Sequence, residues 1–243
     1  MNYILILGAK SDIAKELAKI YAINDYCLYL AGRNITELDL LKTDIKVRAN
    51  KKIILKEFDI TDFASHAEFF ASLNPKPIGV IVAAGFMAPQ QACENDFNTT
   101  LNTINVNYTG AISILNIVAT DFEKRKTGFI VGISSVAGDR GRKTNYIYGS
   151  SKAGFSAYLS GLRNRLSSHN INVLTVKPGF VNTKMTEHLS FPEFLSASPE
   201  RVAAEIFQAQ KLNKNILYTT PIWKLIMLII KMIPESIFKK MKI

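Results

Sequence analysis

Short runs of consecutive apolar residues alternate with longer helical patterns along most of this chain. Seven runs are predicted to be strands: Tyr3–Leu7, Tyr26–Leu30, Ile53–Phe58, Gly79–Ala83, Phe129–Ile133, Asn172–Val176 and Asn215–Tyr218. The clearest helical segments between them are Asp12–Tyr21, Asp96–Phe122, Tyr148–His169 and Pro199–Leu212. Strands that are apolar at consecutive positions have both faces covered. The alternation therefore predicts an α/β fold with right-handed βαβ units and a doubly wound parallel sheet.

The length and composition fit a single globular domain followed by a tail. The chain has 243 residues, of which 48% are hydrophobic and 21% charged, so it is long enough to bury a large core. No internal repeat or linker interrupts it. We expect one domain over residues 1–220 and an apolar, basic tail over residues 221–243.

Cysteine and histidine usage gives no reason to expect a metal. Two cysteines, Cys27 and Cys93, cannot form a disulfide framework, and a reducing cytosol suits them. The three histidines, His66, His169 and His188, are scattered along the sequence. No pair of them has the spacing of metal ligands, so no metal is expected.

The charge is strongly basic, with 30 Lys and Arg against 20 Asp and Glu, a net charge of +10. Such a surface attracts phosphate groups of nucleic acids, lipids or nucleotides. The cations are dispersed and no recognition helix stands out, so no nucleic-acid partner is expected. No run reaches the roughly 20 apolar residues that span a bilayer, and the N-terminus lacks the pattern of a signal peptide. A cytoplasmic location is expected.

The first predicted strand runs directly into the turn Gly8–Ala14, and a helix follows. A helix N-terminus offers unpaired N–H groups and a partial positive charge, which favour a phosphate. Gly8 permits a tight turn, and Ser11 or Asp12 can cap the helix. The alternative is an ordinary strand–turn–helix connection, because Asp12 and Ala14 stand where glycines are usual in a dinucleotide site.

The second predicted strand leads into Ala31–Asn34, which contains Arg33. Folds that bind NAD usually have an acidic residue here, for the ribose 2′-hydroxyl, whereas an arginine accommodates the 2′-phosphate of NADP. Lys10 in the first turn could add to the same site. The position therefore favours NADP(H) over NAD(H), and the alternative is a pair of solvated cations.

Tyr148 and Lys152 are four residues apart, so on a helix they share one face. A phenol with a pKa near ~10 is a poor acid–base catalyst at neutral pH. A nearby ammonium lowers that pKa towards the working range. Ser135 follows a predicted strand, at the edge where open α/β sheets bind ligands. A Tyr–Lys pair at this spacing is also common by chance.

Together these segments resemble the short-chain dehydrogenase/reductase family over at least residues Asn2–Thr183. The resemblance rests on seven elements: the turn Gly8–Ala14, Phe58–Asp62, Ala83–Gly85, Val106–Gly110, Ser135, the pair Tyr148 and Lys152, and Pro178–Thr183. It implies a single-domain Rossmann-type fold, a nicotinamide cofactor, a carbonyl substrate and a homo-oligomer.

The resemblance also implies roles for four catalytic residues. Tyr148 would donate the proton to the carbonyl, and Lys152 would lower its pKa and hold the nicotinamide ribose. Ser135 would orient the carbonyl and stabilise the developing oxyanion, and Asn107 would hold a water in a proton relay. The protein positions and polarises, while hydride transfer belongs to the cofactor.

The implied cofactor contacts extend along the whole sheet edge. Asp59 and Ile60 would meet the adenine, Ala84 and Gly85 the adjoining ribose, and Thr183 the nicotinamide amide. The remaining expected contacts are Gly8, Lys10, Ser11, Asp12, Ile13, Arg33, Tyr148, Lys152, Pro178, Gly179 and Val181.

A narrower resemblance is to the reductases of decaprenylphosphoryl 2-keto-pentose in cell-wall arabinan synthesis. It rests on the acidic glycine turn, the basic loop Gly138–Lys143, the segment Val181–Leu189 and the closing segment Ile233–Lys240. It implies NADPH-dependent reduction of a keto-sugar on a polyprenyl phosphate, in sequence with a flavin-dependent oxidase. The alternatives are reduction of a small soluble ketone or sugar, and a non-catalytic NADP-binding sensor.

The basic loop and the tail suggest where such a substrate would bind. Arg140, Arg142 and Lys143 could bind a substrate phosphate, or they could form a solvated loop or a subunit contact. The tail has Ile222, Leu225, Ile226, Ile229, Ile230 and Ile233 at helical spacing, with Lys224 and Lys231 on the opposite face and Lys239, Lys240 and Lys242 beyond Pro234. It could lie on the inner membrane surface as a peripheral anchor, or dock on the core or a partner subunit.

The segment Phe180–Ser198, with Phe191, Pro192, Phe194 and Leu195, occupies the family's substrate-lid position. An apolar lid beside an apolar tail would suit a lipid-linked substrate.

Overall fold

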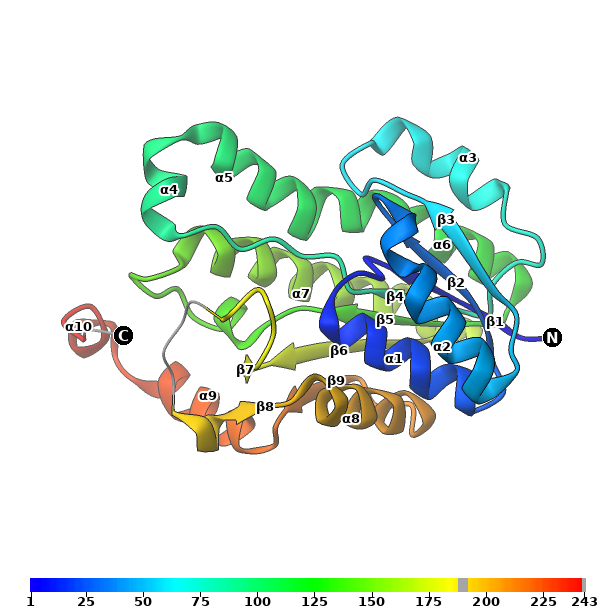
Figure 1. Cartoon of the computed structure of the whole chain (residues 1–243). Coiled ribbons are helices and arrows are strands. Elements are labelled where there is room, and N and C mark those ends of the chain that lie inside the picture. Colours follow the sequence, from blue (N-terminus) through cyan, green and yellow to red (C-terminus); the bar gives the residue numbers. More distant parts are fainter. Residues whose placement is uncertain (188–191, 242–243) are drawn as a thin grey trace.

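Seven parallel strands form one central sheet in the structure, a computed structural model that describes residues 1–187 and 192–241 (Figure 1). Their spatial order is β3-β2-β1-β4-β5-β6-β9. The strands are β1 (Tyr3–Leu7), β2 (Cys27–Gly32), β3 (Ile53–Glu57), β4 (Gly79–Val82), β5 (Phe129–Ile133), β6 (Asn172–Pro178) and β9 (Ile216–Thr219). All seven predicted strands are confirmed, with small shifts at their ends. The order reverses between β1 and β4, and this is the position at which open α/β sheets bind ligands.

Helices cover both faces of the sheet, so it is a Rossmann-type α/β fold. One face packs against α1 (Asp12–Ile23), α2 (Asp39–Ala49) and α8 (Pro199–Lys211). The other packs against α3 (His66–Ala71), α6 (Gly110–Arg125) and α7 (Tyr146–Leu166). Two short helices, α4 (Gln90–Asn95) and α5 (Phe97–Ile104), precede α6, and Figure 1 shows them above the carboxyl end of the sheet.

Strand β1 shows why the apolar runs have no alternation. Ile4 and Ile6 are buried against α1, α2 and α8, whereas Leu5 and Leu7 are buried in the core on the opposite face. Successive side chains of a strand point to opposite faces, and here both faces are covered. The consecutive apolar residues are therefore the pattern of a central strand.

The predicted helix Asp96–Phe122 is two helices joined by a π-helical turn. The Asp96 carboxylate caps α5 by accepting the backbone N–H groups of Asn98 and Thr99. The π turn, Asn105–Thr109, contains Asn107, and the Gly110 N–H donates to the carbonyl of Asn105. Such bulges inside helices are frequent at functional sites.

The chain ends in two helices beside the sheet, α9 (Ile222–Met232) and α10 (Glu235–Phe238). Pro234 lies between them, as the N-cap of α10. A two-stranded sheet, β7 (Phe180–Val181) with β8 (Ser196–Ala197), brackets the predicted lid segment. In Figure 1 these elements and the C-terminus lie at the end of the molecule opposite the N-terminus.

Candidate active site

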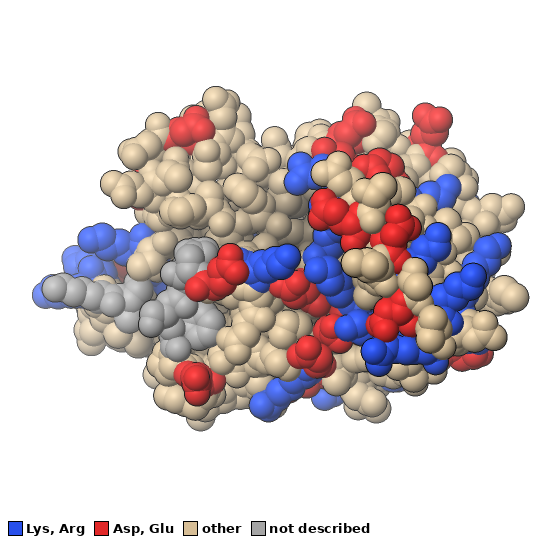
Figure 2. Space-filling model, viewed as in Figure 1, with Lys and Arg blue, Asp and Glu red and all other residues tan. Residues whose placement is uncertain are grey.

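A cleft of about 580 Å³ opens at the carboxyl ends of β1, β2, β4, β5 and β6. Every cofactor-binding residue expected from the sequence lines it: Gly8, Lys10, Ser11, Asp12, Ile13, Arg33, Asp59, Ile60, Ala84, Gly85, Tyr148, Lys152, Pro178, Gly179, Val181 and Thr183. Figure 2 shows basic and acidic side chains next to one another at the edge of a hollow near the middle of the face.

The turn after β1 brings the start of α1 to the cleft. Gly8 has a φ of +80°, and a Cβ there would lie 2.4 Å from the backbone nitrogen of Ala84, so only glycine fits. Ser11 is the N-cap, and its hydroxyl accepts the N–H of Ala14 at 3.2 Å. Other N–H groups of the first turn have no acceptor within the helix and remain available to an anion. The turn therefore fits a dinucleotide pyrophosphate.

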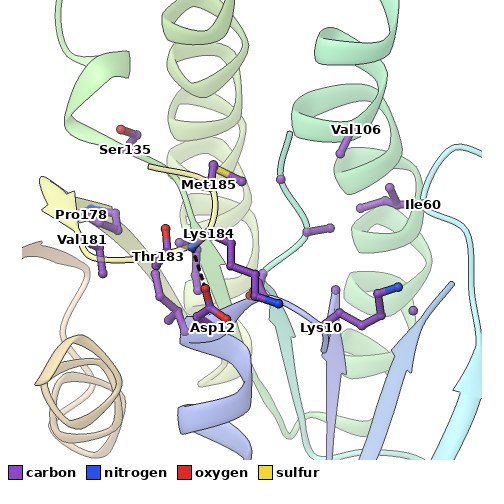
Figure 3. Close-up of a pocket in the computed structure, with 18 of the residues that line it drawn as sticks. Lys10, Asp12, Ile60, Val106, Ser135, Pro178, Val181, Thr183, Lys184 and Met185 are labelled. Carbon is purple, nitrogen blue, oxygen red and sulfur yellow. Dashed lines mark hydrogen bonds between the residues drawn. The ribbon is translucent and has the colours of Figure 1, made fainter. Parts of the chain in front are cut away.

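Asp12, which replaces the usual second glycine, joins two distant parts of the cleft. Its carboxylate accepts the backbone N–H of Lys184 at 2.9 Å, as Figure 3 shows, and the Lys15 ammonium lies 3.4 Å from its other oxygen. These two donors offset the negative charge that Asp12 brings to the start of α1. The loop after β7 is thereby held against the glycine turn.

The end of the cleft next to Arg33 and Asp59, called the adenosine end because the sequence predicts the adenine there, is rich in charged side chains. The Lys10 ammonium lies 2.6 Å from a carboxylate oxygen of Glu37, and Arg33 lies 4.0 Å from Asp59. The hydrogen bond from Lys10 holds the pKa of Glu37 below its usual range, and the charge of Lys184 adds to the effect. Three cations, on Lys10, Arg33 and Lys184, thus line the cleft near Glu37 and Asp59.

The opposite end of the cleft holds Ser135, Tyr148 and Lys152. Ser135 follows β5 and caps a short 3₁₀ helix, Val136–Gly138, by accepting the Ala137 N–H. This turn packs directly on α7, since a Cβ on Gly138 would lie 2.7 Å from the backbone nitrogen of Ala153. The close approach brings Ser135 within hydrogen-bonding reach of the Tyr148 hydroxyl.

Lys152 is 3% exposed, and its ammonium donates to the carbonyl of Ile133 at 3.1 Å. It lies 5.8 Å from the centre of the Tyr148 ring. Burial lowers the pKa of Lys152 to about 8, because an ammonium loses its hydration there. A buried cation therefore lies beside the ring of Tyr148.

The expected lowering of the Tyr148 pKa by Lys152 is wrong. Burial raises the pKa of Tyr148 to about 12, and the hydrogen bond with Ser135 opposes that rise only in part. The phenolate is poorly hydrated in the cleft, and the Lys152 ammonium is turned to a backbone carbonyl. Tyr148 is accordingly a neutral phenol at physiological pH.

Asn107 lies beside the cleft rather than on its wall. Its amide nitrogen donates to the carbonyl of Phe86 at 2.6 Å, and its amide oxygen accepts the Phe86 N–H at 3.0 Å. These bonds fix the segment after β4 that contains Gly85. The side chain thus makes two of the four hydrogen bonds that an amide can make, and its expected contact with a relay water stays a prediction.

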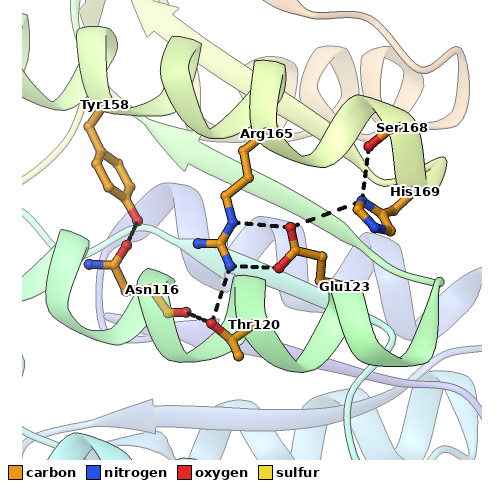
Figure 4. A network of polar contacts seen from close by, with 7 residues as sticks. All are labelled: Asn116, Thr120, Glu123, Tyr158, Arg165, Ser168 and His169. Carbon is orange, nitrogen blue, oxygen red and sulfur yellow. Dashed lines mark hydrogen bonds and ion pairs between the residues drawn. The ribbon is translucent and has the colours of Figure 1, made fainter.

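A polar network on the outer side fixes α7, the helix of Tyr148 and Lys152, against α6 (Figure 4). The Arg165 guanidinium binds both carboxylate oxygens of Glu123, at 3.1 and 2.7 Å. The Tyr158 hydroxyl donates to Asn116 at 2.8 Å. His169 lies just beyond α7, at the helix end predicted for it, 4.0 Å from Glu123. Bidentate pairs of this kind add orientation as well as energy.

The basic loop after Ser135 directs Arg140 to the tail of the chain rather than to a substrate phosphate. Arg140 donates to the carbonyls of Ile230 and Ile233, at 2.7 and 2.6 Å, and pairs with Glu235 at 2.8 Å. Arg142 contacts Met227 of α9. The sequence analysis expected a substrate phosphate, solvent or another subunit as the partner of this loop. None of these is the tail of the same chain, which Arg140 and Arg142 contact.

Sequence reasoning missed several residues of the cleft wall. Lys184, Met185 and Thr186 line it, immediately after the predicted segment Pro178–Thr183. Met185 approaches Gly85 on the cleft wall, since its terminal carbon lies 3.6 Å from the position that a Cβ on Gly85 would take. Their position directly after Thr183 was the available signal.

The described residues contain no group of three or more His, Cys, Asp or Glu placed to hold a metal ion. Within the same part of the chain, no helix is long and apolar enough to cross a membrane. His188, Phe191 and Lys242, which the sequence analysis singled out, lie outside the described residues.

The comparisons with known proteins agree with this geometry. A family model for short chain dehydrogenases matches residues 2–193. An uncharacterized oxidoreductase of Mycobacterium tuberculosis is 32% identical over 241 residues, covering 98% of this chain and 96% of the relative.

Solved structures share the fold. A short-chain dehydrogenase from Sphingobium yanoikuyae in complex with NADPH has a TM-score of 0.83 at 21% identity, covering 97% of this chain and 98% of that one. Actinorhodin polyketide ketoreductase with NADPH has a TM-score of 0.79 at 20% identity, covering 89% and 95%. The family model and the mycobacterial relative establish that this chain is an oxidoreductase of the short-chain dehydrogenase/reductase family.

Proposed function

We propose that the protein is an NADPH-dependent carbonyl reductase in which Tyr148 is the proton donor. The observation that carries this proposal is the arrangement of one cleft. A helix start suited to phosphate lines it, and a buried ammonium lies together with a partly buried phenol and hydroxyl at one end. A bound nicotinamide cofactor would supply the hydride.

Tyr148 suits the donation of a proton to a carbonyl oxygen. With a pKa of about 12 it keeps its proton at neutral pH, and the Ser135 hydroxyl is close enough to share the same oxygen. After donation the phenolate would need a positive neighbour, and Lys152 is charged below a pH of about 8. The buried site strengthens that attraction.

Arg33, Lys10 and Lys184 support a preference for NADPH. Arg33 has only a long contact with Asp59, so its guanidinium could turn to a 2′-phosphate as a two-pronged donor. Lys10 would exchange Glu37 for the phosphate, and Lys184 adds a third positive charge.

For the substrate we propose a keto-sugar linked to a polyprenyl phosphate, reduced in cell-envelope polysaccharide synthesis. The support is the resemblance of the segments around Gly138–Lys143 and Ile233–Lys240 to reductases of that class, together with the apolar surface of the tail near the reactive end. The proposal includes a homo-oligomer, a flavin-dependent oxidase acting in sequence, and a peripheral position on the cytoplasmic face of the inner membrane.

The deciding experiment follows NADPH oxidation by the purified protein with a panel of lipid-linked and soluble ketones, with NADH as the cofactor control. We expect turnover with NADPH and the highest kcat/KM for a lipid-linked keto-sugar. A best substrate among the soluble ketones would overturn the lipid-linked assignment and leave the reductase intact. No turnover of any carbonyl, with NADPH still bound, would support the non-catalytic alternative.

A further inference from the structure

One end of the molecule presents a continuous apolar helix face to solvent. On α9 the side chains of Leu225, Leu228, Ile229 and Met232 expose between 54% and 73% of their surface. Ile237 and Met241 of the following segment are also exposed. Exposed apolar groups of this extent, next to one another, mark an interaction site.

The opposite face of α9 is already bound to the protein. Trp223 and Met227 are buried with Val136, the residue that follows Ser135. The Trp223 indole donates to the carbonyl of Leu195 at 3.0 Å and lies edge-on to Phe180. Core packing therefore accounts for Trp223 and Met227, and it leaves the outward residues unexplained.

Arg140 fixes how this face is held. Its guanidinium binds the last carbonyls of α9, pairs with Glu235 and lies 3.8 Å from the centre of the Phe238 ring. Cations at a helix C-terminus are favourable. The outward face of α9 is thus presented rigidly and is tied to the loop that begins at Ser135.

The charges around the apolar face are positive. Lys224 and Lys231 lie along one edge of α9, and Lys239 and Lys240 follow α10, all exposed. Within residues 221–241 the acidic residue is Glu235, which Arg140 neutralises. A second copy packed on this face about a twofold axis would bring like charges together, whereas an anionic lipid surface complements them.

We infer that the outward face of α9 and α10 docks on anionic membrane lipids, with Leu225, Leu228, Ile229 and Met232 entering the headgroup region. Amphipathic surfaces of this kind lie in the plane of the interface, and their lysines lie near the phosphates. The surface borders the reactive end of the cleft through Arg140 and Val136. The functional role of this membrane docking rests on the proposed lipid-linked substrate, but the docking itself is tested without any substrate.

The first experiment measures co-sedimentation of the full chain with vesicles of phosphatidylcholine alone or of equal parts phosphatidylcholine and phosphatidylglycerol. We expect binding to the anionic vesicles, weakened by salt, and little binding to the neutral ones. The triple variant Leu225→Ser, Leu228→Ser, Ile229→Ser should weaken binding by about tenfold or more. The matched control, Leu40→Ser with Val47→Ser on α2, removes side chains that are 86% and 81% exposed and should leave binding unchanged.

The second experiment separates charge from apolar contact. Lys224→Glu with Lys231→Glu should weaken binding roughly 25-fold or more, since each lysine near an anionic surface contributes about fivefold. Lys46→Glu with Lys124→Glu makes the same change in net charge away from the tail and should have a far smaller effect. If the two double variants lost vesicle affinity equally, binding would depend only on the net charge of the protein, and the proposal would be overturned.

Two further results would also overturn it. One is absence of vesicle binding by the unchanged protein. The other is a shift in oligomeric state caused by the triple serine variant while vesicle binding is unchanged, which would assign the face to a second copy. NADPH oxidation with a soluble ketone reports on folding and on the proposed chemistry in every variant. Failure of membrane docking is therefore distinct from failure of the reductase.

Discussion

The two ends of the cleft hold positive charge in opposite ways. At the adenosine end, Arg33 is exposed and Lys10 is partly exposed, and they lie near the carboxylates of Asp59 and Glu37. At the reactive end, Lys152 is buried beside Tyr148 and binds a backbone carbonyl. Water screens the charges of Lys10 and Arg33, but it does not screen the charge of the buried Lys152.

This difference separates recognition from chemistry. Exposed ion pairs contribute little each and are easily exchanged, so the adenosine end can give up Glu37 for a phosphate. The buried ammonium of Lys152 cannot exchange one partner for another in this way, and burial instead lowers its pKa. We therefore expect single changes at the reactive end to have large effects, and changes at the adenosine end to have small, salt-dependent ones.

The largest effect is expected from Tyr148→Phe. Loss of the hydroxyl should lower kcat roughly 100- to 10,000-fold, the range for a positioned acid, while NADPH affinity changes little. The measurements are steady-state NADPH oxidation and a fluorescence titration of NADPH. Tyr146→Phe is the control on the same helix, because the Tyr146 hydroxyl binds Glu94 outside the cleft. Comparable losses in both variants would remove Tyr148 from its proposed role.

The next effect is a pH dependence at the reactive end. The pKa of Lys152 is about 8, so its ammonium loses its proton as the pH rises through that value. The neutral amine cannot stabilise the Tyr148 phenolate that donation leaves, so kcat/KM for reduction should fall above a pH of about 8. A profile of kcat/KM against pH in constant ionic strength tests this. A profile that stays flat until the carbonyl substrate or cofactor degrades would contradict it.

A smaller effect is expected at Arg33. Arg33→Ala should reduce the ratio of NADPH to NADH affinity about tenfold, the value of one charge-assisted hydrogen bond. Arg48→Ala is the matched control, an exposed arginine on α2 that pairs with Asp44. Titration of both cofactors gives the ratio directly. Parallel weakening of NADPH and NADH by Arg33→Ala would show that Arg33 does not read the 2′-phosphate.

The smallest effect is expected at Glu37. Glu37→Gln frees Lys10 from its ion pair and should tighten NADPH binding by about fivefold or less, as expected for an exposed pair. The gain should shrink as salt is added. Titration of NADPH at two salt concentrations measures both. A loss of affinity would mean that Glu37 orders Lys10 for the cofactor rather than competing with it.

Much of the fold was predictable because each strand has its own local signal. The seven apolar runs predicted the strands of the sheet, and the turn at Gly8 predicted the start of the first helix. The π turn around Asn107 was not predictable, since Asp96–Phe122 keeps one helical periodicity throughout. A bulge changes the hydrogen bonding by one residue and leaves little trace in an apolar pattern.

The residues that line the cleft were largely predictable, but their electrostatics were not. Tyr148, Lys152 and Ser135 have fixed spacings, whereas the rise in the Tyr148 pKa depends on burial. The contacts of Arg140 were also out of reach, because its partners are backbone carbonyls more than 80 residues later in the sequence. Every residue has a backbone carbonyl, so the sequence does not indicate which carbonyl an arginine will bind. Only the folded structure shows that contact.

Arg140 has a practical consequence for handling the protein. It ties the end of α9 to the loop that begins at Ser135, so we expect a mechanical load on the tail to disturb the segment next to this proposed catalytic residue. An affinity tag or a surface-immobilisation anchor is therefore better placed at Met1, at the far end of the molecule (Figure 1).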